Sequence, residues 1–175
     1  IVKLGDEWYH VDLVFDDPTP DRTGRVLHDY FLLNDEEIEN AANPHTGWIS
    51  RFTSTSEKYK DGIWKNVSSR MVYSGGKWYY IDHNDASLVS RKFSDAESQN
   101  TIFTFDEKWY MNENDKRYWI GVFSGVSTFL GNVFINTPSE IAAYNTMTGR
   151  VSVFYEAKEG ETLYGSNIYK NTLEY

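Results

Sequence analysis

The chain has 175 residues, a formal net charge of −9 and no cysteine. An acidic surface repels phosphate backbones, so nucleic acid is not an expected partner. A mean hydropathy of −0.58, with no long uncharged apolar run, argues against a membrane-spanning helix. The lack of cysteine excludes a disulfide scaffold and a thiol nucleophile within these residues. Aromatic residues make up 17% of the chain, which is typical of a folded protein rather than a disordered one.

The first fifteen residues predict a β-hairpin. A period of two runs through Val2 and Leu4, and again through Trp8, His10, Asp12 and Val14, on either side of a Gly-Asp turn. Two prolines make residues 16–21 a loop. Because the chain starts at Ile1, without Met and inside a strand pattern, we expect it to be a piece of a longer polypeptide.

A short apolar strand at residues 30–33 and a helix are expected next. Asn34 fits the N-cap of that helix, and Glu37 completes a capping-box pattern. The helix should run over residues 35–42 and end before the Asn-Pro pair at residues 43–44.

The composition changes near residue 48. Residues 49–63 are rich in Ser, Thr, Lys and Asp, which favours a linker. Residues 64–175 contain short aromatic-rich runs between Gly, Asn, Asp and Ser, and these runs predict antiparallel strands. The runs are residues 71–73, 78–81, 88–92, 101–105, 118–120, 132–135, 140–144 and 151–155.

These runs form an internal repeat. Residues 78–82 can be superimposed on 132–136, and residues 88–92 on 141–145. The period of about 50–54 residues is typical of propeller blades, and a third copy is expected to begin at residues 162–165. The sequence therefore predicts a mainly β chain, α+β at its N-terminus, with antiparallel meander sheets forming about two propeller-like blades.

Three motifs stand out in the first 48 residues: Trp-Tyr-His-Val-Asp at 8–12, Asp-Asp-Pro at 16–18 and Tyr-Phe-Leu-Leu-Asn-Asp-Glu-Glu-Ile at 30–38. Together they resemble the C-terminal part of the transglutaminase-like core, which has a papain-like Cys-His-Asp fold. In that family a Cys thiolate attacks an amide carbonyl, a His acts as general base and an Asp orients the His. The resemblance implies that Asp12 is the orienting carboxylate, and that the His and the Cys would precede Ile1.

Three residues close to Asp12 in sequence, Trp8, His10 and Phe15, are candidate binding residues by the same resemblance. His10 and Asp12 lie two residues apart on the expected strand, about 7 Å along the backbone, which does not favour a direct His-Asp pair. The family carries Thr-Trp before Asp-Asp-Pro, whereas this chain has Val14-Phe15, so a polar contact and an indole are lost.

Two functions follow from these resemblances. The first is a bacterial, secreted or cell-surface cysteine-dependent enzyme that transfers or hydrolyses amides of proteins or cell-wall peptides. It needs no cofactor, and it would be inactive as residues 1–175 alone. The alternative is a non-catalytic cell-surface binding or adhesion module that recognises a protein or a glycan. It is favoured by Val14-Phe15 and by residues 64–175, which resemble propeller-type repeats of bacterial cell-surface proteins. Open edge strands would also allow two copies to pair.

The remaining candidates have ordinary structural interpretations. The metal-ligand types occur without the spacing of a metal site, so no metal is expected. They are Asp16, Asp17, Asp21, His28, His45 and His83. The sequon at residues 66–68 carries no meaning in a bacterial chain.

The aromatic residues of the repeats are expected mainly to form the core, with a sugar-binding platform as the alternative. They are Trp78, Tyr79, Tyr80, Trp109, Tyr110, Tyr118 and Trp119.

Overall fold

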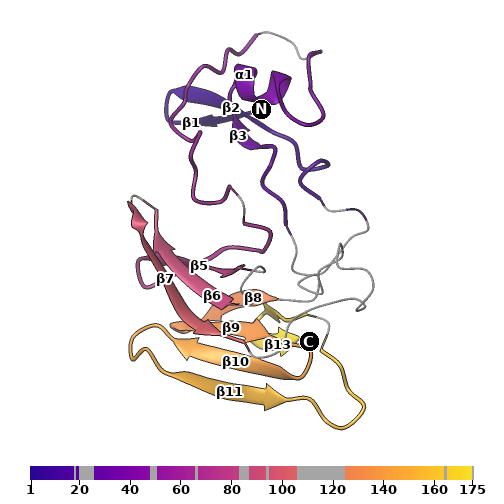
Figure 1. The fold of residues 1–175 in the computed structure, drawn as a ribbon, viewed down its shortest axis with the longest axis vertical. Coiled ribbons are helices and arrows are strands. Elements are labelled where there is room, and N and C mark those ends of the chain that lie inside the picture. Colours follow the sequence, from indigo (N-terminus) through magenta and orange to yellow (C-terminus); the bar gives the residue numbers. More distant parts are fainter. Residues whose placement is uncertain are drawn as a thin grey trace. The chain divides into compact units, whose positions relative to one another are not determined.

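The structure is a computed structural model (Figure 1). It describes residues 1–17, 19, 26–47, 51–65, 67–82, 87–93, 95–105, 125–163 and 165–174. The chain forms two compact units: unit 1 comprises Ile1–Pro18 and Leu27–Asn66, and unit 2 comprises Thr19–Val26 and Val67–Tyr175. In the described ranges all strand pairs are antiparallel and there is one short helix, so the predicted mainly β, antiparallel class is confirmed. No helix among these residues is long and apolar enough to span a membrane.

Unit 1 contains a three-stranded sheet with the order β1-β2-β3. Its strands are β1 (Val2–Leu4), β2 (Glu7–Val11) and β3 (Phe31–Leu33). The predicted hairpin is confirmed, and its turn carries a positive φ at Gly5. However, β2 ends at Val11 rather than continuing to residue 14. The reason is that the Asp12 carboxylate accepts hydrogen bonds from the backbone amides of Val14 and Phe15 and so stabilises a turn.

A bulge in β3 lies opposite the end of β2. His10 pairs with Leu33 and Val11 pairs with Phe31, so Leu32 is the extra residue. Leu32 has φ 57°, a left-handed conformation that bulky side chains rarely adopt. Bulges redirect the side chains around them, and this one adjoins the residues that form the candidate site.

The helix α1 (Asp35–Glu39) begins as predicted. The Asn34 side chain accepts from the Glu37 amide, and the Glu37 carboxylate accepts from the Asn34 amide, which completes the capping box. The predicted end at residue 42 is wrong by three residues. Asn40 ends the helix, because both its backbone amide and its side chain donate to the Glu36 carbonyl.

The predicted linker at residues 49–63 is also wrong, because residues 51–65 pack within unit 1. Ser54 is fully buried, and its hydroxyl donates to the carbonyl of Trp8 on β2. Its own carbonyl accepts from the Asp35 amide at 2.7 Å. Polar composition alone suggested a linker, but here the polar groups satisfy backbone atoms of the sheet.

Unit 2 consists of two four-stranded meander sheets and a hairpin, in the part of the chain that is described. The first sheet contains β4 (Val72–Ser74), β5 (Lys77–Asp82), β6 (Ser87–Lys92) and β7 (Asp95–Thr104). The second contains β8 (Val126–Phe129), β9 (Asn132–Asn136), β10 (Glu140–Asn145) and β11 (Val151–Glu156). The hairpin contains β12 (Asn167–Tyr169) and β13 (Thr172–Glu174).

The strand predictions for unit 2 agree with these elements at most of the runs. The run at residues 118–120 lies outside the described residues, and β8 was not predicted. The third repeat forms its first strand at residues 167–169, a little after the expected start.

Each sheet of unit 2 packs on the next through buried apolar side chains. One cluster joins β5 and β6 to β8 and β9, and a second joins β9 and β10 to the hairpin. The first contains Tyr79, Ile81, Leu88, Phe105, Val126, Val133 and Ile135. The second contains Phe134, Ile141, Ala143 and Leu163, with Ile168 and Leu173 packed against it.

The hairpin turns give the true register of the repeat. The turns at residues 75–76, 130–131 and 170–171 have positive φ at both central positions, as type I′ turns require. Aligning these turns places Tyr79 on Phe134, so the predicted superposition of residues 78–82 on 132–136 is wrong by one residue. A slip of one residue exchanges the two faces of a strand. In contrast, the superposition of Leu88 on Ile141 agrees with the strand pairing.

Candidate functional site

An open cavity of about 430 Å³ lies in unit 1, at the end of β2. It is lined by His10, Val11, Asp12, Ile38, His45, Thr46 and Gly47. β2 supplies His10, the residue that follows β2 is Asp12, and the loop after α1 supplies His45. The structure therefore brings two of the predicted site residues together with His45, for which the sequence favoured an ordinary structural role.

The Asp12 carboxylate has a fixed orientation. Its Oδ1 accepts hydrogen bonds from the amides of Val14 at 2.9 Å and Phe15 at 3.1 Å. Its Oδ2 lies 3.5 Å from Nδ1 of His45, and the two side chains are 26% and 28% exposed. One oxygen is thus held by the backbone while the other faces an imidazole at the cavity.

Aromatic rings hold His45 in place. Its ring stacks on Tyr30, with centroids 5.5 Å apart, and lies edge-on to Phe15 at 4.9 Å. The Tyr30 hydroxyl accepts from the Asn43 amide at 2.7 Å, which fixes that ring in turn. Phe15, predicted as a binding residue, therefore packs against His45 together with Tyr30.

His10 pairs with Asp35 rather than with Asp12. Its Nε2 lies 2.7 Å from Asp35 Oδ1, and its side chain is 8% exposed. The other oxygen of Asp35 accepts from the Ser54 amide at 3.2 Å. The pair joins β2 to the start of α1 and to the segment after it. No motif or spacing in the sequence indicated the pair, since 25 positions separate its members.

Trp8, the third predicted binding residue, lies elsewhere. Its ring packs against Phe52, with centroids 4.2 Å apart, and Lys3 lies over its face at 5.8 Å. Trp8 is not among the residues that line the cavity.

Asp16 stabilises the backbone at Tyr30, whose ring stacks on His45. Its Oδ1 accepts from the Tyr30 amide at 2.8 Å, and its carbonyl accepts from the Leu27 amide at 3.0 Å. Burial raises the pKa of the Asp16 carboxyl, although the hydrogen bond from Tyr30 and the nearby His28 act to lower it. Asp16 therefore acts as a structural acceptor for backbone amides.

A second cavity of about 660 Å³ lies in unit 1. Phe15, Tyr30 and Leu33 contribute apolar lining. Glu37 and Lys65, which also line it, form an ion pair of 3.0 Å. Phe15 and Tyr30 therefore contact His45, which lines the first cavity, and they also line the second one.

In the described ranges, no group of three or more His, Asp and Glu side chains is arranged to hold a metal ion. His28 lies edge-on to Phe31, with centroids 6.0 Å apart. Asp21, His83 and the sequon asparagine lie outside the described residues.

The aromatic residues of β5 divide between core and surface. Tyr79 and Tyr80 are buried, as expected, whereas Trp78 is half-buried. Desolvation raises the pKa of both tyrosines. Trp109, Tyr110, Tyr118 and Trp119 lie outside the described residues.

Comparison with known proteins gave no match to a protein-family model, to a curated protein or to a solved structure. A functional assignment must therefore come from the chemistry of the site and from the sequence motifs.

Proposed function

We propose that unit 1 is the carboxylate-bearing end of a cysteine-dependent core that acts on amide bonds of proteins or cell-wall peptides. In this proposal Asp12 is the positioning residue for the imidazole that serves as general base. The chain itself has no cysteine, so the thiol would come from outside these residues. The protein would act outside a bacterial cell or at its surface.

The orientation of Asp12 supports this proposal. In a Cys-His-Asp arrangement the carboxylate must keep one oxygen directed at an imidazole N–H, so that the ring keeps the right tautomer and the imidazolium is stabilised. Two backbone amides hold Oδ1 of Asp12, which leaves Oδ2 directed into the cavity at 3.5 Å from an imidazole nitrogen. A general base from outside these residues would take the place that His45 has beside Oδ2.

The test measures turnover of a glutamine-containing peptide by the longest polypeptide that contains this segment. Release of ammonia is the readout. Asp12→Asn keeps the size of the side chain and removes its charge, and we expect it to lower kcat about a thousandfold. Asp17→Asn, at an exposed position of the same loop, is the matched control and should turn over like the wild type.

The pH–rate profile separates positioning from a structural role. If Asp12 stabilises an imidazolium, Asp12→Asn must shift the profile, whereas a loss of folding would lower the rate equally at every pH. Unchanged turnover in Asp12→Asn would contradict the proposal.

A second candidate function is binding without catalysis. The observation that favours it is His45, because an imidazole of this chain already faces the oxygen that a catalytic imidazole would need. In that case unit 1 is a support and recognition occurs on the β-repeats of unit 2. Absence of amide turnover in the wild-type polypeptide, with ligand binding retained, would select this function.

A further inference from the structure

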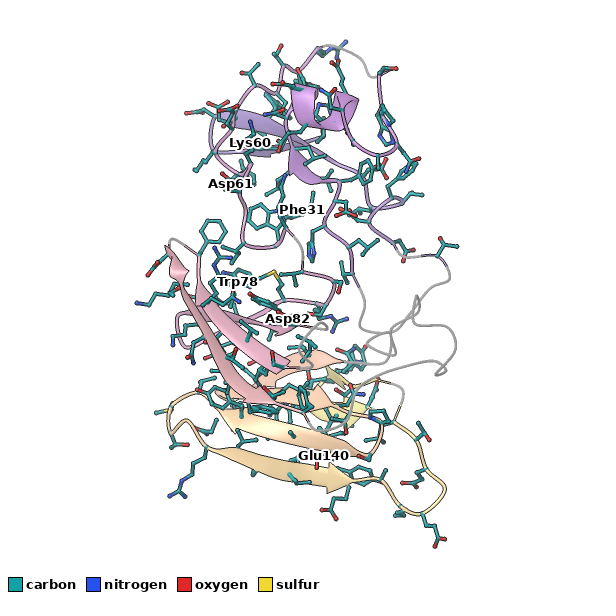
Figure 2. All side chains as sticks on the ribbon, viewed as in Figure 1. Phe31, Lys60, Asp61, Trp78, Asp82 and Glu140 are labelled. Atoms are coloured by element: carbon teal, nitrogen blue, oxygen red, sulfur yellow. The ribbon has the colours of Figure 1, made fainter. Side chains whose placement is uncertain are left out.

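One face of the first sheet carries a row of three side chains across three neighbouring strands. Tyr73 on β4 pairs with Trp78 on β5, and Trp78 pairs with Arg91 on β6. Directly opposed residues have Cβ atoms about 4.5–5.5 Å apart. The Tyr73 and Trp78 rings are in contact, with centroids 5.3 Å apart. Figure 2 shows Trp78, labelled on its strand.

The row is partly exposed to solvent, and its last residue is the cationic Arg91. Tyr73 is 57% exposed, and Trp78 and Arg91 are half-buried. Nε of Arg91 is buried and has no hydrogen-bond partner among the described residues. None of the ion pairs in that part of the chain involves Arg91. Among the described residues, the half-buried guanidinium therefore has the Tyr80 hydroxyl as a hydrogen-bonding neighbour and no carboxylate partner, in a chain with a net charge of −9.

The Tyr80 hydroxyl is a polar neighbour of Arg91. Tyr80 lies on the same face as Trp78, and its hydroxyl donates to the Gln99 side chain at 3.3 Å. Arg91 acts on the Tyr80 hydroxyl to lower its pKa, against the larger effect of burial. Arg91 is thus next to a phenol rather than in a purely apolar environment.

The equivalent row of the second sheet serves to pack against the first sheet. The same row there is Thr128, Val133 and Tyr144, and Val133 is fully buried against the first sheet. A row that serves only to pack carries apolar residues at its centre. The row of the first sheet instead combines two aromatic rings in contact, inclined to each other by 58°, with a cation, which fits a different partner.

We propose that Tyr73, Trp78 and Arg91 form a binding site for an acidic saccharide, such as a uronic acid residue. The apolar face of the pyranose ring would stack on Trp78, Tyr73 would contact its edge, and its carboxylate would bind the Arg91 guanidinium. Arginine and carboxylate match in geometry and form charge-assisted hydrogen bonds. This inference rests on the second candidate function, to which it gives a ligand class and a site, and it is independent of Asp12.

The experiment is titration of the purified chain with methyl glucuronide, followed by NMR or calorimetry. Methyl glucoside provides the same ring without the charge, and benzoate provides a carboxylate on a flat ring that is not a sugar. We expect methyl glucuronide to bind with a dissociation constant on the order of 1 mM, and both reference compounds to bind at least about tenfold more weakly.

Substitutions in Tyr73 and Arg91 test whether the sugar binds at this row. Arg91→Gln should weaken methyl glucuronide at least about tenfold and abolish the discrimination against methyl glucoside. Tyr73→Ala, at an exposed position, should weaken both sugars. Phe154→Ala removes an aromatic ring that is 58% exposed on the second sheet, and it should change nothing.

Three outcomes would overturn the inference. They are the absence of saturable binding by the folded chain, equal affinity for benzoate and methyl glucuronide, and an affinity that Arg91→Gln leaves unchanged. Amide turnover and its loss in Asp12→Asn are measured separately, so failure of this site leaves the catalytic proposal standing.

Discussion

The two units of this protein are stabilised in different ways. In unit 1, polar side chains bind backbone groups at nearly every junction: Asp12 and Asp16 in the first loop, Asn34 at the helix start and Ser54 in the returning segment. In unit 2, buried apolar side chains join one sheet to the next. Unit 1 thus depends on satisfied hydrogen bonds, and unit 2 depends on the volume of its core.

This difference determines where function can reside. A region built from oriented carboxylates and imidazoles offers groups that can move protons or hold another imidazole, as the cavity beside Asp12 does. A stack of sheets offers repeated surfaces, on which the side chains of one cross-strand row can differ while the remaining rows still pack. The proposed catalytic and binding functions follow this division.

The largest effect should come from truncation of the core of unit 2. Ile135 is fully buried between the two sheets, and Ile135→Ala should cost about 4 kcal/mol through lost burial and a cavity. Urea unfolding monitored by amide exchange would measure it. Val153→Ala, at a position 51% exposed, is the control and should cost less than about 0.5 kcal/mol. Equal loss of protection in unit 1 would show that the two units do not unfold independently.

A smaller effect is expected from removal of one hydroxyl in unit 1. Ser54 is fully buried, and Ser54→Ala removes the hydroxyl that donates to the Trp8 carbonyl, which should cost about 1–2 kcal/mol. The same exchange measurement should show the loss in β2 and β3. Thr53→Ala, at the exposed neighbouring position, serves as the control. If the two variants are equally stable, hydrogen bonds to the backbone do not dominate unit 1.

The smallest effect is a pH dependence in unit 1. Burial raises the pKa of Asp16, so ionisation of this group opposes folding. Its contribution to stability is fully present below the ordinary pKa of 3.8 and is lost as the pH rises through the raised value. Asp16→Asn keeps an acceptor for the Tyr30 amide, so we expect a higher unfolding midpoint at pH 7 and no gain at pH 3.

Thermal unfolding of both proteins across this pH range is the measurement. A gain of equal size at both pH values would mean that ionisation of Asp16 is not the cause. A loss at pH 7 would mean that the charged form is the better acceptor for Tyr30.

Local patterns were sufficient for a large part of the fold. The capping box of Asn34 and Glu37 and the turn at Gly5 depend on neighbours in sequence, and both were predicted. The segment at residues 51–65 was misassigned because its role depends on contacts with strands far away in sequence. The repeat was found, but its register in β5 was set by a hairpin turn that the side-chain pattern did not reveal.

The candidate site could be predicted only in part for the same reason. Asp12 and His10 belong to one motif of five consecutive residues, 8–12, which the sequence alone can identify. Their partners, His45 and Asp35, come from other segments, and no spacing rule connects them. Likewise Arg91 lies beside Trp78 only because β5 and β6 are paired.

The sequence by itself determined the antiparallel β class, the capped helix and the presence of a repeat, because alternation and turn chemistry act over a few residues. The tertiary structure alone decided which imidazole meets which carboxylate, and which face of each repeated strand is buried. Those choices depend on pairing between distant segments, where a shift of one residue exchanges the two faces of a strand.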